Sequence, residues 1–301
     1  MNPEYFAFGI VVSSILTALV AGNNLSASVG TLIGSRIVSR NAGTLIGAAG
    51  FAIGLLIQGH SLSRAAAELF PEGQSYRLLA MLISLAIFLV ASLTRSPLSL
   101  TMAMVGVSIG LSLRFGEASA LSSVRPVVLM WAVAPLVSVA GAVALNRLVS
   151  GITYRDEWAA AAVIKTLLII SSFLTAITLG ANTLGFIESM AGFSTATTAA
   201  MVLSIFTGCF FLSRGVIKRV GEEIYRMRYT NAFISLIVSA ALVETATLFG
   251  IPLSNTQTLT SSVLGTALSY RYKAVYVRPF LIVIATWVLS PVTGMALGYL
   301  L

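Results

Sequence analysis

Two short segments, residues 97–101 and 252–258, place a proline before closely spaced hydroxyl side chains within apolar surroundings. They read Pro-Leu-Ser-Leu-Thr and Pro-Leu-Ser-Asn-Thr-Gln-Thr. Proline suits the first position of a helix, and the Ser and Thr that follow can cap it. A helix that begins inside a membrane presents unpaired N–H groups and the positive end of its dipole. This pattern predicts an oxyanion receptor that needs no lysine or arginine.

The same residue types have a purely structural interpretation. Ser and Thr in membrane helices bond to their own backbone or join neighbouring helices, and for a single Ser-x-Thr that interpretation is the better one. Here the motif occurs twice at matching positions, each time after a proline. The duplication favours a binding site, with the two helix starts facing each other across a pseudo-two-fold axis.

A second repeated motif joins glycine to asparagine, at residues 21–25 and 180–184. The copies read Ala-Gly-Asn-Asn-Leu and Gly-Ala-Asn-Thr-Leu. Glycine permits sharp unwinding and close backbone approach, and buried Asn offers both a donor and an acceptor. Packing through small residues explains the glycine and alanine content but not the paired asparagines. We therefore expect each apolar span to be interrupted here, where protein or an aqueous cavity satisfies the freed backbone groups.

Composition places these motifs in a membrane protein. Hydrophobic residues make up 57% of the 301-residue chain, charged residues 9%, and the mean hydropathy is +0.95. Soluble domains carry roughly 25% charged residues, so a water-soluble fold is excluded. The apolar runs are continuous rather than alternating, which favours helices over a membrane barrel. The net charge of +8 is typical of basic cytoplasmic loops and does not indicate a nucleic-acid partner.

The apolar runs predict an all-α polytopic fold built from two halves, 1–150 and 151–301. Five runs occur in each half, in the same order of long and short, and a Val-Arg-Pro…Trp…Pro pattern closes both halves. An odd number of spans inserts the second half upside down, so we expect two inverted-topology repeats with broken or re-entrant helices. The ten runs are 5–22, 43–58, 77–94, 97–113, 124–146, 158–179, 192–213, 230–249, 252–269 and 278–300.

The distribution of cations gives an orientation. If each run crosses once and both termini lie outside, thirteen cations fall in inner loops and four in outer loops, as the positive-inside rule predicts. Lys165 lies within a span. We therefore expect a multi-pass protein of the inner cell membrane, with ten crossings or with hairpins at the polar motifs. The inner cations are Arg36, Arg40, Arg95, Arg147, Arg155, Arg214, Lys218, Arg219, Arg226, Arg228, Arg271, Lys273 and Arg278.

Two carboxylates at membrane depth, Glu188 and Glu244, are candidates for moving protons. Glu244 precedes the second proline motif by less than three turns and can face the same cavity. Alternatively it caps a helix, lies near the interface, or pairs with Lys165 or Arg95.

Intramembrane enzymes need a nucleophile with a base, or a metal cluster. The chain has a single histidine, His60, and a single cysteine, Cys209. A histidine metal centre and an intrachain disulfide are therefore excluded by count. We expect a protein that is not an enzyme and carries no cofactor.

All four motif copies resemble the inorganic phosphate transporter family, PiT, whose signatures read Gly-Ala-Asn-Asp-x-Ala-Asn-Ala and Pro-x-Ser-Thr/Asn-Thr-His. The resemblance covers the whole chain in the family's order. It implies a homodimeric phosphate carrier in which Ser and Thr at the helix starts hold the anion. The implied anion-binding residues are Ser99, Thr101, Ser254, Asn255, Thr256, Asn23 and Asn182.

The departures from the family pattern concern cation coupling. The family's aspartate is replaced by Asn24 in the first copy and Thr183 in the second, and its histidine by Met102 and Gln257. Glu188 stands near the second copy. Without the family's carboxylates a sodium site must use neutral oxygens, which bind a hard cation more weakly. Sodium and a proton are therefore both candidate coupling ions. The implied coupling residues are Asn24, Thr183, Gln257, Glu188 and Glu244.

The expected function is secondary transport of a small inorganic oxyanion by alternating access. Phosphate is the first choice from the resemblance. Sulfate is the alternative substrate, because monohydrogen phosphate carries a proton that wants an acceptor and the motif carboxylates are missing. A passive anion channel is the alternative mechanism.

Overall fold

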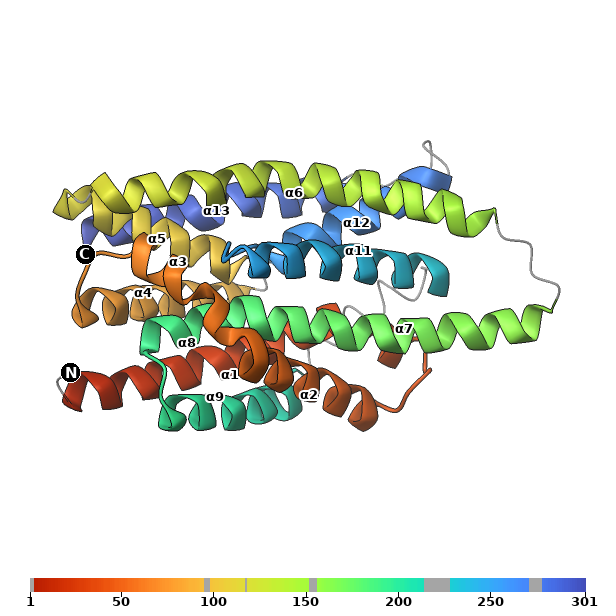
Figure 1. Ribbon diagram of the computed structural model, residues 1–301, viewed down its shortest axis with the longest axis horizontal. Helices are drawn as coiled ribbons and strands as arrows, with labels where there is room; N and C mark the ends of the chain where they lie inside the picture. The colour runs from red at the N-terminus through yellow and green to blue at the C-terminus, as the bar shows by residue number, and fades with distance from the viewer. Residues whose placement is uncertain (1–2, 95–97, 117, 152–155, 214–227, 271–277) are drawn as a thin grey trace.

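The computed structural model describes residues 3–94, 98–116, 118–151, 156–213, 228–270 and 278–301, and over these ranges every regular element is a helix. The helices lie along one axis in a single bundle, and both chain ends are at the same end of it (Figure 1). Seven of the helices in these ranges are long and apolar enough to cross a membrane. The predicted all-α polytopic class is confirmed.

The first half of the chain supplies six α-helices and one 3-10 turn. They are α1 (Pro3–Gly34), α2 (Arg40–Gln58), η1 (Gly59–Leu62), α3 (Ser63–Leu69), α4 (Gln74–Thr94), α5 (Leu100–Phe115) and α6 (Ala118–Ser150).

The second half supplies the remaining described helices, with two π-helical turns. They are α7 (Glu157–Leu179), η2 (Gly180–Leu184), α8 (Gly185–Ala191), α9 (Thr195–Thr207), η3 (Gly208–Leu212), α11 (Tyr229–Leu248), α12 (Asn255–Tyr270) and α13 (Arg278–Leu300). Each of the ten apolar runs expected from the sequence corresponds to one of the long helices.

Two helix pairs form hairpins that enter the bundle from opposite ends. In Figure 1, α4 runs inward from the end that holds both termini and α5 returns to that end, while α11 and α12 do the same from the opposite end. The helices of each pair pack against each other. At 16 residues, α5 and α12 are about 24 Å long, shorter than the roughly 30 Å hydrocarbon core. Their lengths favour the re-entrant alternative for α5 and α12, whereas α4 and α11 are long and apolar enough to cross.

The two halves of the chain are interleaved through backbone-level contacts. Helix α2 packs on α7 and η2, and α1 packs on α9 and η3. A Cβ added to Gly180 would lie 2.1 Å from Phe51 O, and one added to Gly208 would lie 2.1 Å from Ala18 O. Only glycine allows this approach. Small-residue packing, which the sequence offered as an alternative, is thus a main cause of the glycine-rich motifs.

The first hairpin is held against α13 in the same way. Glycines on both helices face the partner's backbone: an added Cβ at Gly106 would lie 2.2 Å from Pro291 O, and one at Gly294 would lie 2.2 Å from Ala103 O. Gly110 and Gly298 repeat the arrangement one turn further along. Helix α12 packs in turn on α6. The second helix of each hairpin, α5 or α12, therefore packs along a long helix, α13 or α6 respectively.

Candidate functional site

The predicted serine cap forms at the start of α5, which begins at Leu100, while Pro97 lies outside the described residues. Ser99 has an extended backbone (φ −90°, ψ 117°), and its Oγ accepts the N–H of Met102 at 3.4 Å. The N–H of Ser99 donates to Ser290 Oγ on α13 at 3.2 Å. Thr101 is buried in the first turn. The predicted cap is confirmed, and α13 fixes its place.

The start of α12 is fixed by the way α11 ends. Gly250, at φ +68°, has the left-handed conformation that glycine adopts readily, and its N–H donates to Thr247 O at 3.0 Å. The N–H of Ile251 donates to Ala246 O at 2.8 Å, which completes a Schellman motif. Proline follows and stops the helix, so Pro252 lies two residues before the capping serine rather than at the expected first helical position.

Ser254 is the capping residue of α12, and its hydroxyl lies within hydrogen-bond distance of the hydroxyl of Thr256. Its Oγ accepts the N–H of Gln257 at 3.4 Å and lies 3.0 Å from Thr256 Oγ1. Ser254 is 1% exposed. Two hydroxyls therefore lie together at the first turn of α12.

Asn182, from the π-helical turn η2, holds the segment that leads into α12. Its Nδ2 donates to Thr247 Oγ1 at 2.9 Å and to Ile251 O at 3.1 Å, and its Oδ1 accepts the N–H of Leu253 at 3.0 Å. The residue is fully buried. Both amide hydrogens are used on protein atoms, so the side chain positions the start of α12.

Gln257 fills a gap that a proline leaves in α6. Pro135 has no N–H, so the carbonyl four residues earlier, on Trp131, loses its helical partner. Gln257 Nε2 donates to Trp131 O at 2.9 Å. The Trp…Pro pattern in the sequence thus marks a backbone carbonyl that lacks its helical partner and accepts a hydrogen bond from α12.

Several polar atoms beside the start of α12 are buried and have no hydrogen-bond partner among the described residues. Asn255 Oδ1 accepts from Ser239 Oγ at 3.2 Å, but Asn255 Nδ2 is unpartnered. Gln257 Oε1 and Trp131 Nε1 are unpartnered as well. Leaving such groups unpaired costs free energy. The arrangement offers one amide donor and one amide acceptor within a turn of Ser254.

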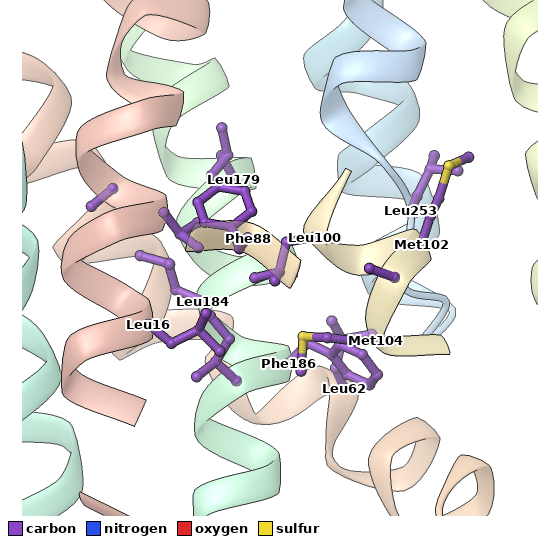
Figure 2. Close-up of a cluster of buried hydrophobic side chains, with 14 of the residues drawn as sticks. Leu16, Leu62, Phe88, Leu100, Met102, Met104, Leu179, Leu184, Phe186 and Leu253 are labelled. Carbon is purple, nitrogen blue, oxygen red and sulfur yellow. The ribbon is translucent and has the colours of Figure 1, made fainter. Parts of the chain in front are cut away.

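One residue beside the start of α5 and one beside the start of α12 both lie in the hydrophobic core. Met102, in the first turn of α5, and Leu253, just before α12, lie in the same apolar cluster, and Figure 2 shows both on one side of it. The hairpins reach this region from opposite ends of the bundle (Figure 1). The described residues at these helix starts, 98–102 and 251–258, are all uncharged.

The first asparagine motif does not interrupt its helix. Asn23 and Asn24 lie half-buried in the middle of α1, which runs on to Gly34. The expectation of a break is wrong for this copy. Its glycine instead allows close packing between helices, since a Cβ added to Gly22 would lie 2.8 Å from Gly208 O. In the second copy the chain stays helical through a π turn that contains Thr183, 5% exposed.

The two carboxylates have neutral partners. Gln58 Nε2 donates to Glu244 Oε1 at 2.6 Å, a bond between α2 and α11 that replaces the pairing considered with Lys165, which is exposed on α7. Glu188 is 2% exposed and accepts a hydrogen bond from Thr198 Oγ1. Arg95, the other pairing considered, lies outside the described residues.

Sequence reasoning did not identify Gln58, Thr247 or Trp131 as parts of this region. The proline four residues after Trp131 was a usable signal, whereas the roles of Gln58 and Thr247 depend on contacts between helices. No group of three or more His, Cys, Asp or Glu side chains that could hold a metal occurs within the ranges given above.

Comparison with known proteins places the whole chain among transporters. A profile of the phosphate transporter family matches residues 20–298. A Methanocaldococcus jannaschii protein named "Putative phosphate permease MJ0630" is 25% identical over 298 residues, which cover 97% of this chain and 95% of the relative. A solved structure described as the sodium-dependent phosphate transporter superposes with a TM-score of 0.87 at 16% identity, covering 99% of this chain and 98% of the other. At that identity the superposition shows a shared fold.

Proposed function

The chain belongs to the phosphate transporter family, and from this premise we propose that it carries inorganic phosphate across the membrane by alternating access, with the anion held between the starts of α5 and α12. Family membership makes the chain a multi-pass membrane transporter rather than an enzyme. The observation that carries the proposal is the pair of hairpins whose capped helices each begin with buried, uncharged residues.

The anion seat is assigned to hydroxyl and amide donors. Ser254 and Thr256 present two hydroxyls 3.0 Å apart, and Asn255 adds a buried amide nitrogen that lacks a partner. Ser99 and Thr101 occupy the matching positions on α5. A tetrahedral dianion can accept hydrogen bonds from both groups together with the opening N–H groups. Neutral donors also let the anion leave again, as a carrier requires.

The asparagines take separate roles in this proposal. Asn182 is assigned to position α12, because its amide group is already bonded to the residues before that helix. Asn23, with Asn24 beside it on α1, retains the anion- and ion-binding roles that the resemblance implies.

Phosphate is favoured over sulfate by the acceptors that the site offers. Monohydrogen phosphate needs one acceptor for its proton, and sulfate needs none. Gln257 Oε1 is a buried acceptor without a partner within a turn of Ser254. This amide stands where the resemblance places a histidine, and it supplies the acceptor that the missing carboxylates would otherwise provide.

Coupling to a cation gradient belongs to the same proposal. The structural neighbour is described as a sodium-dependent phosphate transporter, and sodium is the first assignment here, bound by neutral oxygens at Asn24 and Thr183, since the oxygen of Gln257 is assigned to the phosphate proton. Glu188 and Glu244 are the proton carriers if the coupling ion is a proton, since both are ionisable and lie in helices long and apolar enough to cross a membrane.

Alternating access is supported by the way the halves pair. Helix α1 packs on α9 as α7 packs on α2, and α5 packs on α13 as α12 packs on α6. These exchanges are what a pseudo-two-fold relation between residues 1–150 and 151–301 would produce. The homodimer implied by the resemblance and the orientation with both termini outside are part of the proposal.

The test is uptake of radiolabelled phosphate into proteoliposomes that contain the full-length protein. We expect saturable uptake that a sodium or proton gradient accelerates and that excess unlabelled phosphate inhibits more strongly than sulfate. Stronger inhibition by sulfate would make it a sulfate permease. Uptake without gradient dependence would rule out symport, and unitary currents in planar bilayers would identify a channel.

A further inference from the structure

A cavity of about 510 Å³ lies beside the residues that lead into α12. One wall is η1 and α3, the second is the start of α6, and the third is the turn between α11 and α12. In Figure 1, α3 and the start of α6 lie in the half of the bundle that holds both termini. The lining residues include Ser61, Arg64, Glu68, Ser123, Gly250 and Ile251.

The cavity is charged, unlike the helix starts beyond it. Arg64 and Glu68 form an ion pair along one face of α3, with Arg64 Nε 2.6 Å from Glu68 Oε1. Their side chains are 89% and 45% exposed, so the pair contributes little to stability and is easily replaced. The bond to Glu68 uses Nε, one of the five N–H donors of the guanidinium. An oxyanion that enters the cavity can therefore replace Glu68 as the partner of Arg64 at a small cost in free energy.

The third wall connects the cavity to the proposed anion seat. Gly250 and Ile251 line the cavity and form the Schellman turn, and a Cβ added to Gly250 would lie 3.3 Å from Ser61 O. Asn182 bonds Ile251 O and Leu253 N, and the next residue is Ser254, which caps α12. An anion in the cavity is separated from the seat by this short turn.

We propose that this cavity is the vestibule through which phosphate reaches the seat from the side of the termini, with Arg64 capturing the anion and Glu68 acting as the counter-charge that it displaces. The proposal rests on the proposed function. Once Glu68 is displaced, the cation of Arg64 attracts the anion and raises the rate of capture. The anion passes from Arg64, through displacement of the turn at Gly250, to the neutral donors at Ser254 and Thr256.

The first test compares phosphate uptake by charge variants in proteoliposomes. Arg64→Gln should raise KM about three- to tenfold with little change in the maximal rate, because capture is impaired and the seat is intact. Glu68→Gln should lower KM, because Arg64 no longer has a resident partner. Arg114→Gln is the matched control: Arg114 is an exposed cation near the same end, bonded to Tyr299 O at 3.1 Å, and does not line the cavity.

The outcomes separate this inference from the proposed function. Absence of phosphate uptake by the wild-type protein would overturn the function. Wild-type uptake combined with an unchanged KM in Arg64→Gln would overturn the vestibule alone, as would an equal rise in KM for Arg114→Gln. Should Arg64→Gln fail to insert, Arg64→Lys replaces it; the vestibule then requires near wild-type KM in the lysine variant and a lower KM in Glu68→Gln.

A second test detects occupancy directly. Ser123→Cys, in a Cys209→Ala background, places a thiol on the α6 wall, and Ala67→Cys places one on the exposed face of α3 outside the cavity. Phosphate at about ten times KM should slow labelling of Ser123→Cys by a thiol reagent roughly tenfold, compared with sodium chloride of equal ionic strength. Labelling of Ala67→Cys should not change. Equal labelling of Ser123→Cys with and without phosphate would overturn the proposal.

Discussion

Replacing Asn182 by alanine tests how the start of α12 is held. The change removes three hydrogen bonds, to Thr247 Oγ1, Ile251 O and Leu253 N. Side-chain hydrogen bonds in membrane proteins are worth about 0.6 kcal/mol on average, with a maximum of about 1.7. Three of them amount to about 2 kcal/mol. Since 1.4 kcal/mol is about a factor of ten, the ordered form of this segment should lose up to about thirtyfold in population relative to displaced forms.

The effect should appear in phosphate affinity, because the proposed anion seat requires Ser254 and Thr256 to be in place. We expect Asn182→Ala to raise the KM for uptake by up to about thirtyfold and to lower the melting temperature in detergent. Thr178→Ala is the matched control: Thr178 lies one turn earlier, is buried, and among the described residues its hydroxyl bonds to Thr175 O within its own helix. Wild-type KM and melting temperature in Asn182→Ala would refute this account of the site.

The other predictions concern the anion seat, the carboxylate and the packing. Ser254→Ala or Thr256→Ala should weaken phosphate binding about tenfold or more, because each removes a hydrogen bond to a charged ligand; unchanged affinity in inserted protein would place the seat elsewhere. Glu244→Gln should flatten the pH dependence of uptake if Glu244 carries the coupled proton, and an unaltered pH profile would remove it from the mechanism. Gly180→Ala should destabilise the protein by about 1–3 kcal/mol, because the new Cβ would lie 2.1 Å from Phe51 O. In a detergent melting series, Gly9→Ala is its control, with the nearest atom at 3.8 Å; equal melting temperatures would contradict the packing argument.

The sequence predicted the features that depend on local chemistry. Continuous apolar runs located the long helices, because backbone groups in a bilayer must be satisfied within each helix. The Ser that follows each Pro-Leu pair caps its helix at Ser99 and Ser254, as its side-chain chemistry indicates. The sequence left re-entrant hairpins as an alternative to single crossings, because the length of an apolar run does not distinguish the two.

The features that the sequence did not specify depend on partners from distant segments. The Gly22-Asn23 pair was expected to unwind α1, yet the helix is continuous because Gly208 packs against it. Asn182 was expected to contact the anion, and the structure shows its amide bonded to residues about 70 positions away. Polar residues inside a membrane protein thus have ligand-binding and structural uses that one sequence does not separate.

The glycine contacts between α5 and α13 also constrain how the molecule can move. Gly106 and Gly294 bring the two backbones so close that sliding or rotation of one helix past the other would drive main-chain atoms together. Helices α5 and α13 must therefore move together as one rigid body. Along α12 the corresponding position carries Ser261 in place of Gly106, so that arm lacks one of these interlocks. The two hairpins are therefore held unequally in the bundle, despite their matched sequence motifs.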